Sequence, residues 1–403
     1  MRCFSDCHFH AITLKDPDFL ALLDSLYDAE GRELLSNLTS DYILTGKLFK
    51  DGNFRKTLSN VLTVFSRSIA ESFLIMEKDL EGCFSDKRFI YAGKFHFRSQ
   101  EYDKILMLPL VIDFSDNPMT QSHAYYRLSP KERLTVYADE TIQGIRQYYE
   151  SSPEGLFEFY PFLGINPAYH SMEYLVDILD KHINISHSAH PWHTVPDKPF
   201  YGIKLYPPLG FNPLPEDKEE QEKVFYLYEY CSYYKIPLVT HCDDQGFRGV
   251  QTGKAWEYTS PGTWGKVLER YPGLVIDFAH FGKQYALTSL AGPEGAARRI
   301  RRLPDSPWFY KILSLMEEYP GVYADLSFSG SERSFHRELY AALQERDSSE
   351  LMKRILFGSD FPVSLFKSES YSSYFSTWES APFSDEEVEE IANSNALRFL
   401  GLS

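Results

Sequence analysis

Two histidines one residue apart, His8 and His10, lie in the apolar segment FSDCHFHAIT at residues 4–13. Side chains alternate along a strand, so residues i and i+2 point to the same face. Imidazole nitrogens are common ligands of divalent metals. A pair with this spacing also fits an ordinary buried strand, so the remaining ligands have to be found elsewhere in the chain.

Residues of the same chemical kind follow hydrophobic segments later in the sequence. Lys204 lies in YGIKLYPP, His241 in PLVTHC, His280 at the end of LVIDFAH, and Asp360 at the end of ILFGSD. The intervals are 37 residues from Lys204 to His241, 39 to His280, 45 to Asp325 and 35 to Asp360. Each interval is about one strand plus one helix, so these residues recur at the pitch of a βα repeat.

Short segments rich in β-branched or aromatic residues alternate with longer helical patterns, such as 217–235, 306–320 and 385–401, the last opened by Ser384 as an N-cap. This order predicts an α/β fold with a parallel sheet. Eight such units favour a (β/α)₈ TIM barrel over an open doubly wound sheet, which more often shows a glycine-rich phosphate loop after its first strand. The predicted strands are 3–9, 105–113, 157–165, 200–206, 237–242, 274–280, 322–328 and 355–360.

The segment 14–104 between the first two predicted strands is too long for a single helix. Its amphipathic patterns at 17–28 and 54–80 predict a helical subdomain inserted on top of the barrel. No internal repeat or flexible linker calls for a second independent domain. The chain is therefore predicted to be one barrel domain, 1–403, with this insertion.

Catalytic groups in such a barrel come from the carboxyl ends of the strands. Histidine and carboxylate ligands there would hold Zn²⁺ with an open position for water, whose pKa falls toward about 7 when it is bound. A neighbouring carboxylate can take the proton of that water. Taken alone, His280 could be a core residue, Asp360 a turn residue and Lys204 an edge lysine. Burying several ionisable groups together without a function would be costly, so the set favours a metal site.

The order of these residues resembles the amidohydrolase superfamily: HxH in the first strand, lysine in the fourth, histidine in the fifth and sixth, and GSD in the eighth. The contexts GIKLYPP, THC, AHFG and GSDFP, and the closing IANSNALRFLGL, are most similar to the amidohydrolase-2 branch. That branch includes aminocarboxymuconate-semialdehyde decarboxylase and pyrone-dicarboxylate lactonase. The resemblance covers residues 3–10 and about 105–403, and leaves the insertion outside.

The resemblance implies that His8, His10, His241 and Asp360 bind one divalent metal, commonly zinc. It also implies that His280 contacts the metal-bound water or the developing oxyanion. Lys204 has two alternatives: it is carboxylated and bridges two metals in binuclear relatives, whereas in mononuclear relatives it contacts substrate or is a bystander. In the binuclear case the histidines of the fifth and sixth strands hold the second ion. One metal ion is favoured here.

Several further residues are weaker candidates. Arg248 in DDQGFRG follows the fifth strand on the catalytic face, where it could pair with a substrate carboxylate or be a solvated loop residue. Asp325 and Ser327 end the seventh strand, where they could hydrogen-bond a ligand or cap the loop. His96 could reach the mouth of the barrel from the insertion.

Two other groups of residues are not expected to be functional. The segment HSAHPWH contains His187, His190 and His193, but it lies between a helix and the fourth strand, on the face opposite to catalysis, and is predicted to be a structural loop. Cys7 and Cys242 flank ligand histidines, but strand alternation turns them outward under the helices. They are expected to pack rather than to react.

Composition excludes some classes of protein. The net charge of −16 argues against unaided binding to nucleic acid or anionic membranes. Five scattered cysteines fit reduced thiols, no secretory segment is visible, and no apolar run reaches the roughly 18 residues of a membrane helix. The sequence therefore predicts a cytoplasmic protein with a small-molecule substrate, and a homo-oligomer is left open.

The leading hypothesis is a metal-dependent hydrolase in which a metal-bound hydroxide attacks an amide, lactone or related carbonyl. Asp360, His280 and Lys204 are its predicted catalytic residues. The alternative is a metal-dependent non-oxidative decarboxylase of a small carboxylic acid, and a more remote one is a barrel that binds a metal or metabolite without catalysis.

Overall fold

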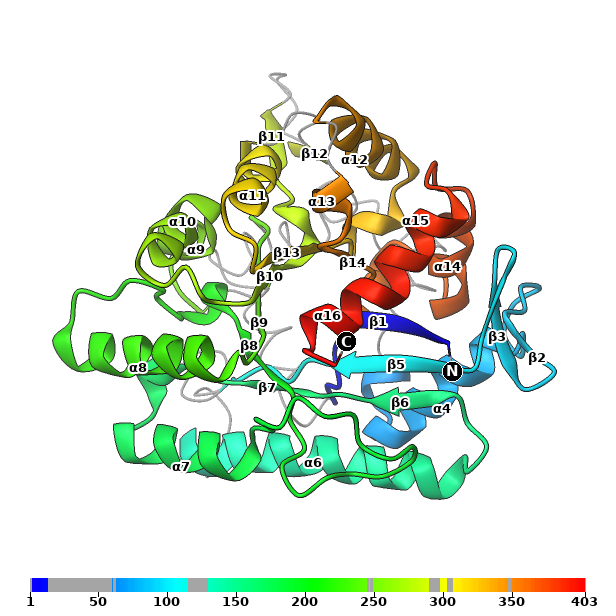
Figure 1. Ribbon diagram of the computed structural model, residues 1–403, viewed down its shortest axis with the longest axis horizontal. Coiled ribbons are helices and arrows are strands. Elements are labelled where there is room, and N and C mark those ends of the chain that lie inside the picture. Colours follow the sequence, from blue (N-terminus) through cyan, green and yellow to red (C-terminus); the bar gives the residue numbers. More distant parts are fainter. Residues whose placement is uncertain are drawn as a thin grey trace.

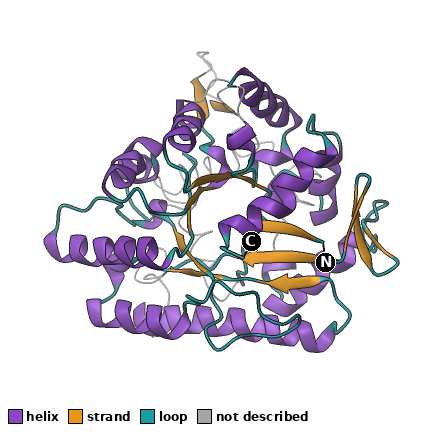
Figure 2. Ribbon diagram, viewed as in Figure 1, coloured by secondary structure: helices purple, strands orange, loops and turns teal. Residues whose placement is uncertain are grey.

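Parallel strands form the centre of the molecule and helices lie around them (Figures 1 and 2). This computed structural model describes residues 2–13, 60, 63–114, 130–244, 246, 249–289, 298–302, 307–346 and 349–402. The core strands are buried over nearly their whole length, as expected for parallel strands that helices cover.

The parallel strands belong to two sheets, whose members follow one another in space nearly as they do in sequence. The first sheet has the order β1 (Cys3–Phe9), β5 (Lys104–Pro109), β6 (Phe157–Phe159). The second has the order β14 (Ile355–Leu356), β13 (Val322–Asp325), β10 (Ile276–Phe278), β9 (Leu238–Thr240), β8 (Gly202–Leu205), β7 (Phe162–Gly164).

Backbone contacts join the two sheets at both ends. At one end β6 and β7 are two halves of the predicted strand 157–165, and Leu110 pairs with Phe162 in parallel. At the other end the Cys7 N–H donates to the Phe357 carbonyl at 2.8 Å. These contacts close the ring of strands, so the predicted (β/α)₈ barrel is confirmed. Each of the eight predicted strands is present, although most are shorter than predicted.

Helices follow the strands on the outside of the barrel (Figure 1). Side chains cap the amino ends of two predicted helices. The Asp217 carboxylate accepts the N–H groups of Glu219 and Glu220, and Ser384, the predicted N-cap, forms a capping box with Glu387. The helices are α6 (Pro130–Ser151), α7 (Met172–His182), α8 (Lys218–Tyr234), α9 (Thr252–Thr259), α10 (Pro261–Arg270), α11 (Pro307–Glu318), α12 (Arg333–Glu345), α13 (Ser349–Met352), α14 (Tyr371–Glu379), α15 (Asp385–Glu389) and α16 (Asn395–Phe399).

The C-terminal helical segment is tied to the last strand by Asn395. Its side-chain amide donates to the carbonyls of Met352 and Ile355, both at 2.7 Å. A π-helical turn, Glu390–Ser394, separates α15 from α16 directly before this residue. These two bonds explain why a buried asparagine lies within the IANSNALRFLGL motif.

The described part of the insertion contains more β structure than predicted. The helix α4 (Ile69–Leu80) lies within the predicted helical pattern 54–80, but an antiparallel sheet of β2 (Ile90–Tyr91), β3 (Lys94–Phe97) and β4 (Gln100–Tyr102) follows it. This sheet lies beside the amino ends of β1 and β5 (Figure 1), because Phe95 and Tyr102 pack on Phe4 with ring centroids 4.9 and 5.3 Å away. The pattern at 17–28 falls outside the described residues.

A short antiparallel hairpin follows β10. It pairs β11 (Tyr285–Ser289) with β12 (Arg298–Arg302).

Within the described part of the chain, no helix is long and apolar enough to cross a membrane.

A buried histidine in α12 is expected to make stability depend on pH. His336 packs against Trp378, with ring centroids 4.7 Å apart, and burial lowers its pKa to about 4. Between pH 6.5 and 4 the unfolded chain therefore binds a proton that the folded chain does not, so the free energy of unfolding falls by about 3 kcal/mol as the pH drops. In His336→Leu that fall should be smaller than in wild type, as measured by urea unfolding at pH 7 and pH 4. Identical pH dependence in both proteins would contradict it.

Candidate metal centre

Two histidines and one aspartate converge where β1 meets the segment after β14. The Nε2 atoms of His8 and His10 lie 3.6 and 3.3 Å from Oδ1 of Asp360. All three residues are buried, and one potential ligand atom of each lies within 4.8 Å of the others. The structure therefore brings together three of the four residues that were predicted to share a metal ion.

The two imidazole rings are oriented by contacts on their other nitrogens. Nδ1 of His8 lies 2.6 Å from Oδ2 of Asp325, and Nδ1 of His10 faces the Leu110 carbonyl at 3.2 Å. The buried Nε2 of His8 has no hydrogen-bond partner among the described residues. Buried polar atoms are rarely left without a partner, and two imidazoles with a carboxylate are ligands that suit a divalent metal. This donor set therefore fits the predicted ion.

The backbone adopts an unfavourable conformation at two candidate residues. Asp360 has φ of 57° and His280 has φ of 62°, in the left-handed region that non-glycine residues seldom occupy. Hydrogen bonds hold both: the Asp360 N–H donates to the His8 carbonyl at 2.7 Å, and the His280 N–H donates to Asp325 Oδ1 at 2.9 Å. Strained residues that their surroundings hold in place are concentrated at functional sites.

Gly358 allows β14 to approach the metal-binding end of β1. A Cβ atom at this position would lie 2.7 Å from Cβ of His8 and 3.1 Å from Cβ of Ser327. The first distance is shorter than real contacts, so any side chain here would displace His8. The glycine of the GSD motif is therefore explained by packing.

His280 and His241 form a second group with Asp243. His280 Nε2 lies 3.3 Å from His241 Nδ1, and His241 Nε2 lies 3.2 Å from Asp243 Oδ1. The ring centroid of His280 is also 4.9 Å from that of His8, so His280 lies between the two groups. The structure places His241 with Asp243 and His280, and the expectation that it shares an ion with His8 stays a prediction. Asp243 was not singled out from the sequence, although its i+2 spacing from His241 was a usable signal.

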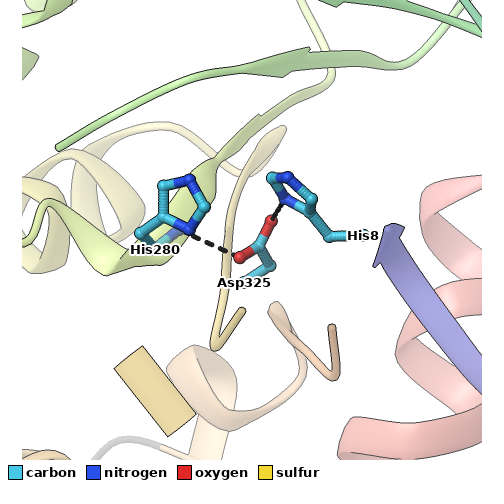
Figure 3. A group of neighbouring side chains, drawn as sticks. All are labelled: His8, His280 and Asp325. Carbon is cyan, nitrogen blue, oxygen red and sulfur yellow. Dashed lines mark hydrogen bonds and ion pairs between the residues drawn. The ribbon is translucent and has the colours of Figure 1, made fainter. Parts of the chain in front are cut away.

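Asp325 lies between His8 and His280 (Figure 3). Ser327 is close to the same groups: its Oγ contacts Asp325 and lies 3.2 Å from His8 Nδ1 and 2.9 Å from His280 Nδ1. Asp325 and Ser327 therefore hydrogen-bond the histidines of the site. Asp325 Oδ1 also accepts the Ser327 N–H at 2.9 Å, which caps the loop as one of the two alternatives expected, and a contact of either residue with a ligand stays a prediction.

Lys204 is buried inside the barrel, which excludes the reading as an edge lysine. Its Nζ has no hydrogen-bond partner among the described residues, and the ring of Tyr206 is 6.0 Å away. Burial lowers the pKa of Lys204 to about 8, although Asp325 and Asp360 favour its charged form.

The charge states of the site follow from burial and from the neighbouring groups. Burial lowers the pKa of His8 to about 3 and holds that of His280 below its usual value. Neutral imidazole is the form that binds metals. Burial alone would raise the pKa of Asp360, but the hydrogen bond to His10 and the nearby imidazoles lower it overall. The site thus combines neutral imidazoles at His8 and His280 with an ionised Asp360 carboxylate.

The remaining predicted residues do not join this group. Arg248 lies outside the described residues. His96 stacks on Tyr91 in the sheet at the amino end of the barrel, with ring centroids 3.6 Å apart, so its expected place at the mouth is wrong. Cys7 and Cys242 are buried, and the Cys242 thiol contacts the Thr259 carbonyl, as expected for packing residues.

The HSAHPWH segment is a structural loop, as predicted. Its three histidines contact three different backbone carbonyls rather than a common centre. The carbonyls are those of Tyr234 for His187, Phe159 for His190 and Gly155 for His193.

A closed α/β barrel with histidines and aspartates gathered at one end of its strands defines the class of metal-dependent barrel enzymes. A sequence model of the amidohydrolase family matches residues 193–402, which is more than half of the chain. The chain therefore belongs to the amidohydrolase family, in the amidohydrolase-2 branch, and is an enzyme. The family depends on divalent metals. No curated protein matched the sequence.

Several solved structures are similar to this chain at low sequence identity. A 5-carboxyvanillate decarboxylase from Novosphingobium aromaticivorans, in complex with manganese and a nitrobenzoic acid, has a TM-score of 0.50 and 12% identity over 99% of this chain and 96% of that one. An amidohydrolase from Burkholderia multivorans with bound zinc has a TM-score of 0.42 and 12% identity over 100% of both chains. A probable 2-pyrone-4,6-dicarboxylic acid hydrolase from Acinetobacter baumannii has a TM-score of 0.42 and 12% identity over 82% of this chain and 88% of that one.

Proposed function

We propose that this enzyme is a zinc-dependent hydrolase that acts on an amide, lactone or related carbonyl of a small molecule in the cytoplasm. The observation that carries the proposal is the convergence of His8 Nε2, His10 Nε2 and Asp360 Oδ1 in one buried site. Nitrogen and oxygen ligands of this kind suit zinc, and a catalytic zinc site keeps a position open for water or substrate. His241 is the proposed fourth ligand, with His280 beside it.

When bound, a divalent ion lowers the pKa of a coordinated water and polarises a carbonyl oxygen. The residues of this chain supply the remaining chemistry. Asp360, which its neighbours keep ionised, accepts a proton at its carboxylate and returns it to the leaving group. His280 faces the same region as His8 and is proposed to contact the attacking water or the developing oxyanion.

The proposal assigns substrate contacts to two basic residues. The Lys204 amine has no partner among the described residues, so a substrate acceptor group can bind there when a single ion is present. Arg248, which lies beyond the described part of the chain, is the proposed partner of a substrate carboxylate.

Non-oxidative decarboxylation is the second candidate function. It requires a proton donor for the carbon that loses CO₂, and the contact of His280 Nε2 with His241 Nδ1 offers a route for that proton. The two reactions share the same residues but differ in their products.

Metal removal is expected to abolish turnover. The enzyme is to be stripped with a chelator, reloaded with Zn²⁺ or Mn²⁺, and assayed on a panel of amides, lactones and aromatic carboxylates. Hydrolysis incorporates one ¹⁸O atom from labelled water into the product carboxylate, whereas decarboxylation releases CO₂. Turnover that persists undiminished in fully stripped protein would refute a metal-dependent reaction of either kind.

A further inference from the structure

The Asp325 carboxylate accepts hydrogen bonds on both of its oxygens. Oδ2 lies 2.6 Å from Nδ1 of His8. Oδ1 accepts the backbone N–H groups of His280 and Ser327, both at 2.9 Å, and the Ser327 hydroxyl. Backbone N–H groups can only donate, and a carboxylate that accepts several such hydrogen bonds is held in its ionised form. An ionised carboxylate can only accept, so each group that faces it must be a donor.

This requirement determines where the proton lies on two histidines. Nδ1 of His8 must carry a hydrogen to donate to Asp325, so its Nε2 holds the lone pair. The Ser327 hydroxyl gives its hydrogen to Asp325, and the Ser327 carbonyl, 3.2 Å from His280 Nδ1, can only accept. Nδ1 of His280 is therefore also protonated. Both rings present an unprotonated Nε2, which in His8 faces Asp360 and in His280 faces His241.

We propose that Asp325, assisted by Ser327, is a positioning residue that fixes His8 and His280 in the Nδ1–H tautomer. This inference rests on the proposed metal site, since only that tautomer of His8 offers a lone pair to an ion beside Asp360. His8 and Asp325 are both fully buried, so water cannot replace the hydrogen bond between them. Carboxylates that orient metal-binding histidines in this way contribute strongly to metal affinity.

The test is Asp325→Asn, which preserves shape but replaces one acceptor oxygen with an NH₂ donor. Keeping the amide oxygen toward His280 and Ser327 retains three hydrogen bonds, so the NH₂ group should face His8 Nδ1. The new NH₂ group and the Nδ1–H group of His8 would then both be donors and could not hydrogen-bond each other. His8 should therefore move its proton from Nδ1 to Nε2. Affinity for Zn²⁺ is expected to fall about 10- to 100-fold, as measured by competition with a chromogenic chelator.

Asp79→Asn is the matched control. Asp79 in α4 is also buried, and its Oδ2 accepts the Ser372 N–H, which an amide oxygen can accept equally well. This variant should bind Zn²⁺ as wild type does. If Asp325→Asn binds Zn²⁺ as tightly as the wild type and the control, the inference is wrong. If the wild type binds no metal ion, the proposed function fails instead.

Tautomers can also be read without any variant, which keeps the inference testable if Asp325→Asn does not fold. In metal-free wild-type protein with ¹⁵N-labelled histidine, the imidazole nitrogen shifts report which ring nitrogen carries hydrogen. The Nδ1–H form is expected for His8 and His280, with assignments from His8→Gln and His280→Gln. An Nε2–H form at His8 would overturn the proposal.

Discussion

Replacing His10 by alanine is expected to remove bound metal and, with it, turnover. Among the described residues, Nε2 of His10 is one of two imidazole nitrogens that ion-pair contacts place beside Asp360, so the variant keeps one histidine and one carboxylate in that group. Loss of an indirect partner of a ligand already lowers metal affinity by about 10- to 100-fold, so loss of a ligand itself should lower it further. Metal content after gel filtration, measured by atomic absorption, and turnover on a substrate from the panel are the two readouts.

His187→Ala provides the control for this substitution. It also removes an imidazole, but His187 contacts the Tyr234 carbonyl in the loop before β8, away from the site. This variant should retain wild-type metal content and activity. One equivalent of metal in His10→Ala would show that the group of His8, His10 and Asp360 is not the binding site.

The barrel could be predicted because each parallel strand is a short apolar run with its own helix, and because both features are local. The interruption within 157–165 was missed, although its cause is in the sequence. Pro161 has no N–H to donate to a neighbouring strand, and it separates β6 from β7. The closure of the ring depends on contacts such as Cys7 with Phe357, which are 350 residues apart and which no local pattern reveals.

The candidate site residues could be predicted because their position in the chain is coupled to the architecture. Polar residues at the carboxyl ends of barrel strands gather at one end of the barrel, so spacing and residue type singled out His8, His10 and Asp360, and the family resemblance gave them the expected role of ligands. The partners of their other atoms could not be found in this way. That Asp325 contacts His8, whereas Asp243 contacts His241, depends on ring orientation and strand tilt.

The insertion shows a different limit. Its β2–β4 sheet is short, and its strands alternate only over two to four residues, which is too few to distinguish them from loops. The sheet is stabilised by the aromatic cluster around Phe4, which comes from a distant part of the chain. Tertiary packing therefore decides its structure and its place at the amino end of the barrel.

Asp360→Asn should lower kcat by about 10²- to 10⁴-fold, which is the usual contribution of a group that transfers a proton. An amide matches the carboxylate in shape and keeps a carbonyl oxygen for the contacts with His8 and His10, but it cannot accept a proton from water at neutral pH. The assay should use saturating Zn²⁺, so that weaker metal binding does not contribute to the loss. With Asp79→Asn again as the buried control at wild-type activity, a kcat for Asp360→Asn within tenfold of wild type would show that the proton is carried by another group, for which His280 is the proposed candidate.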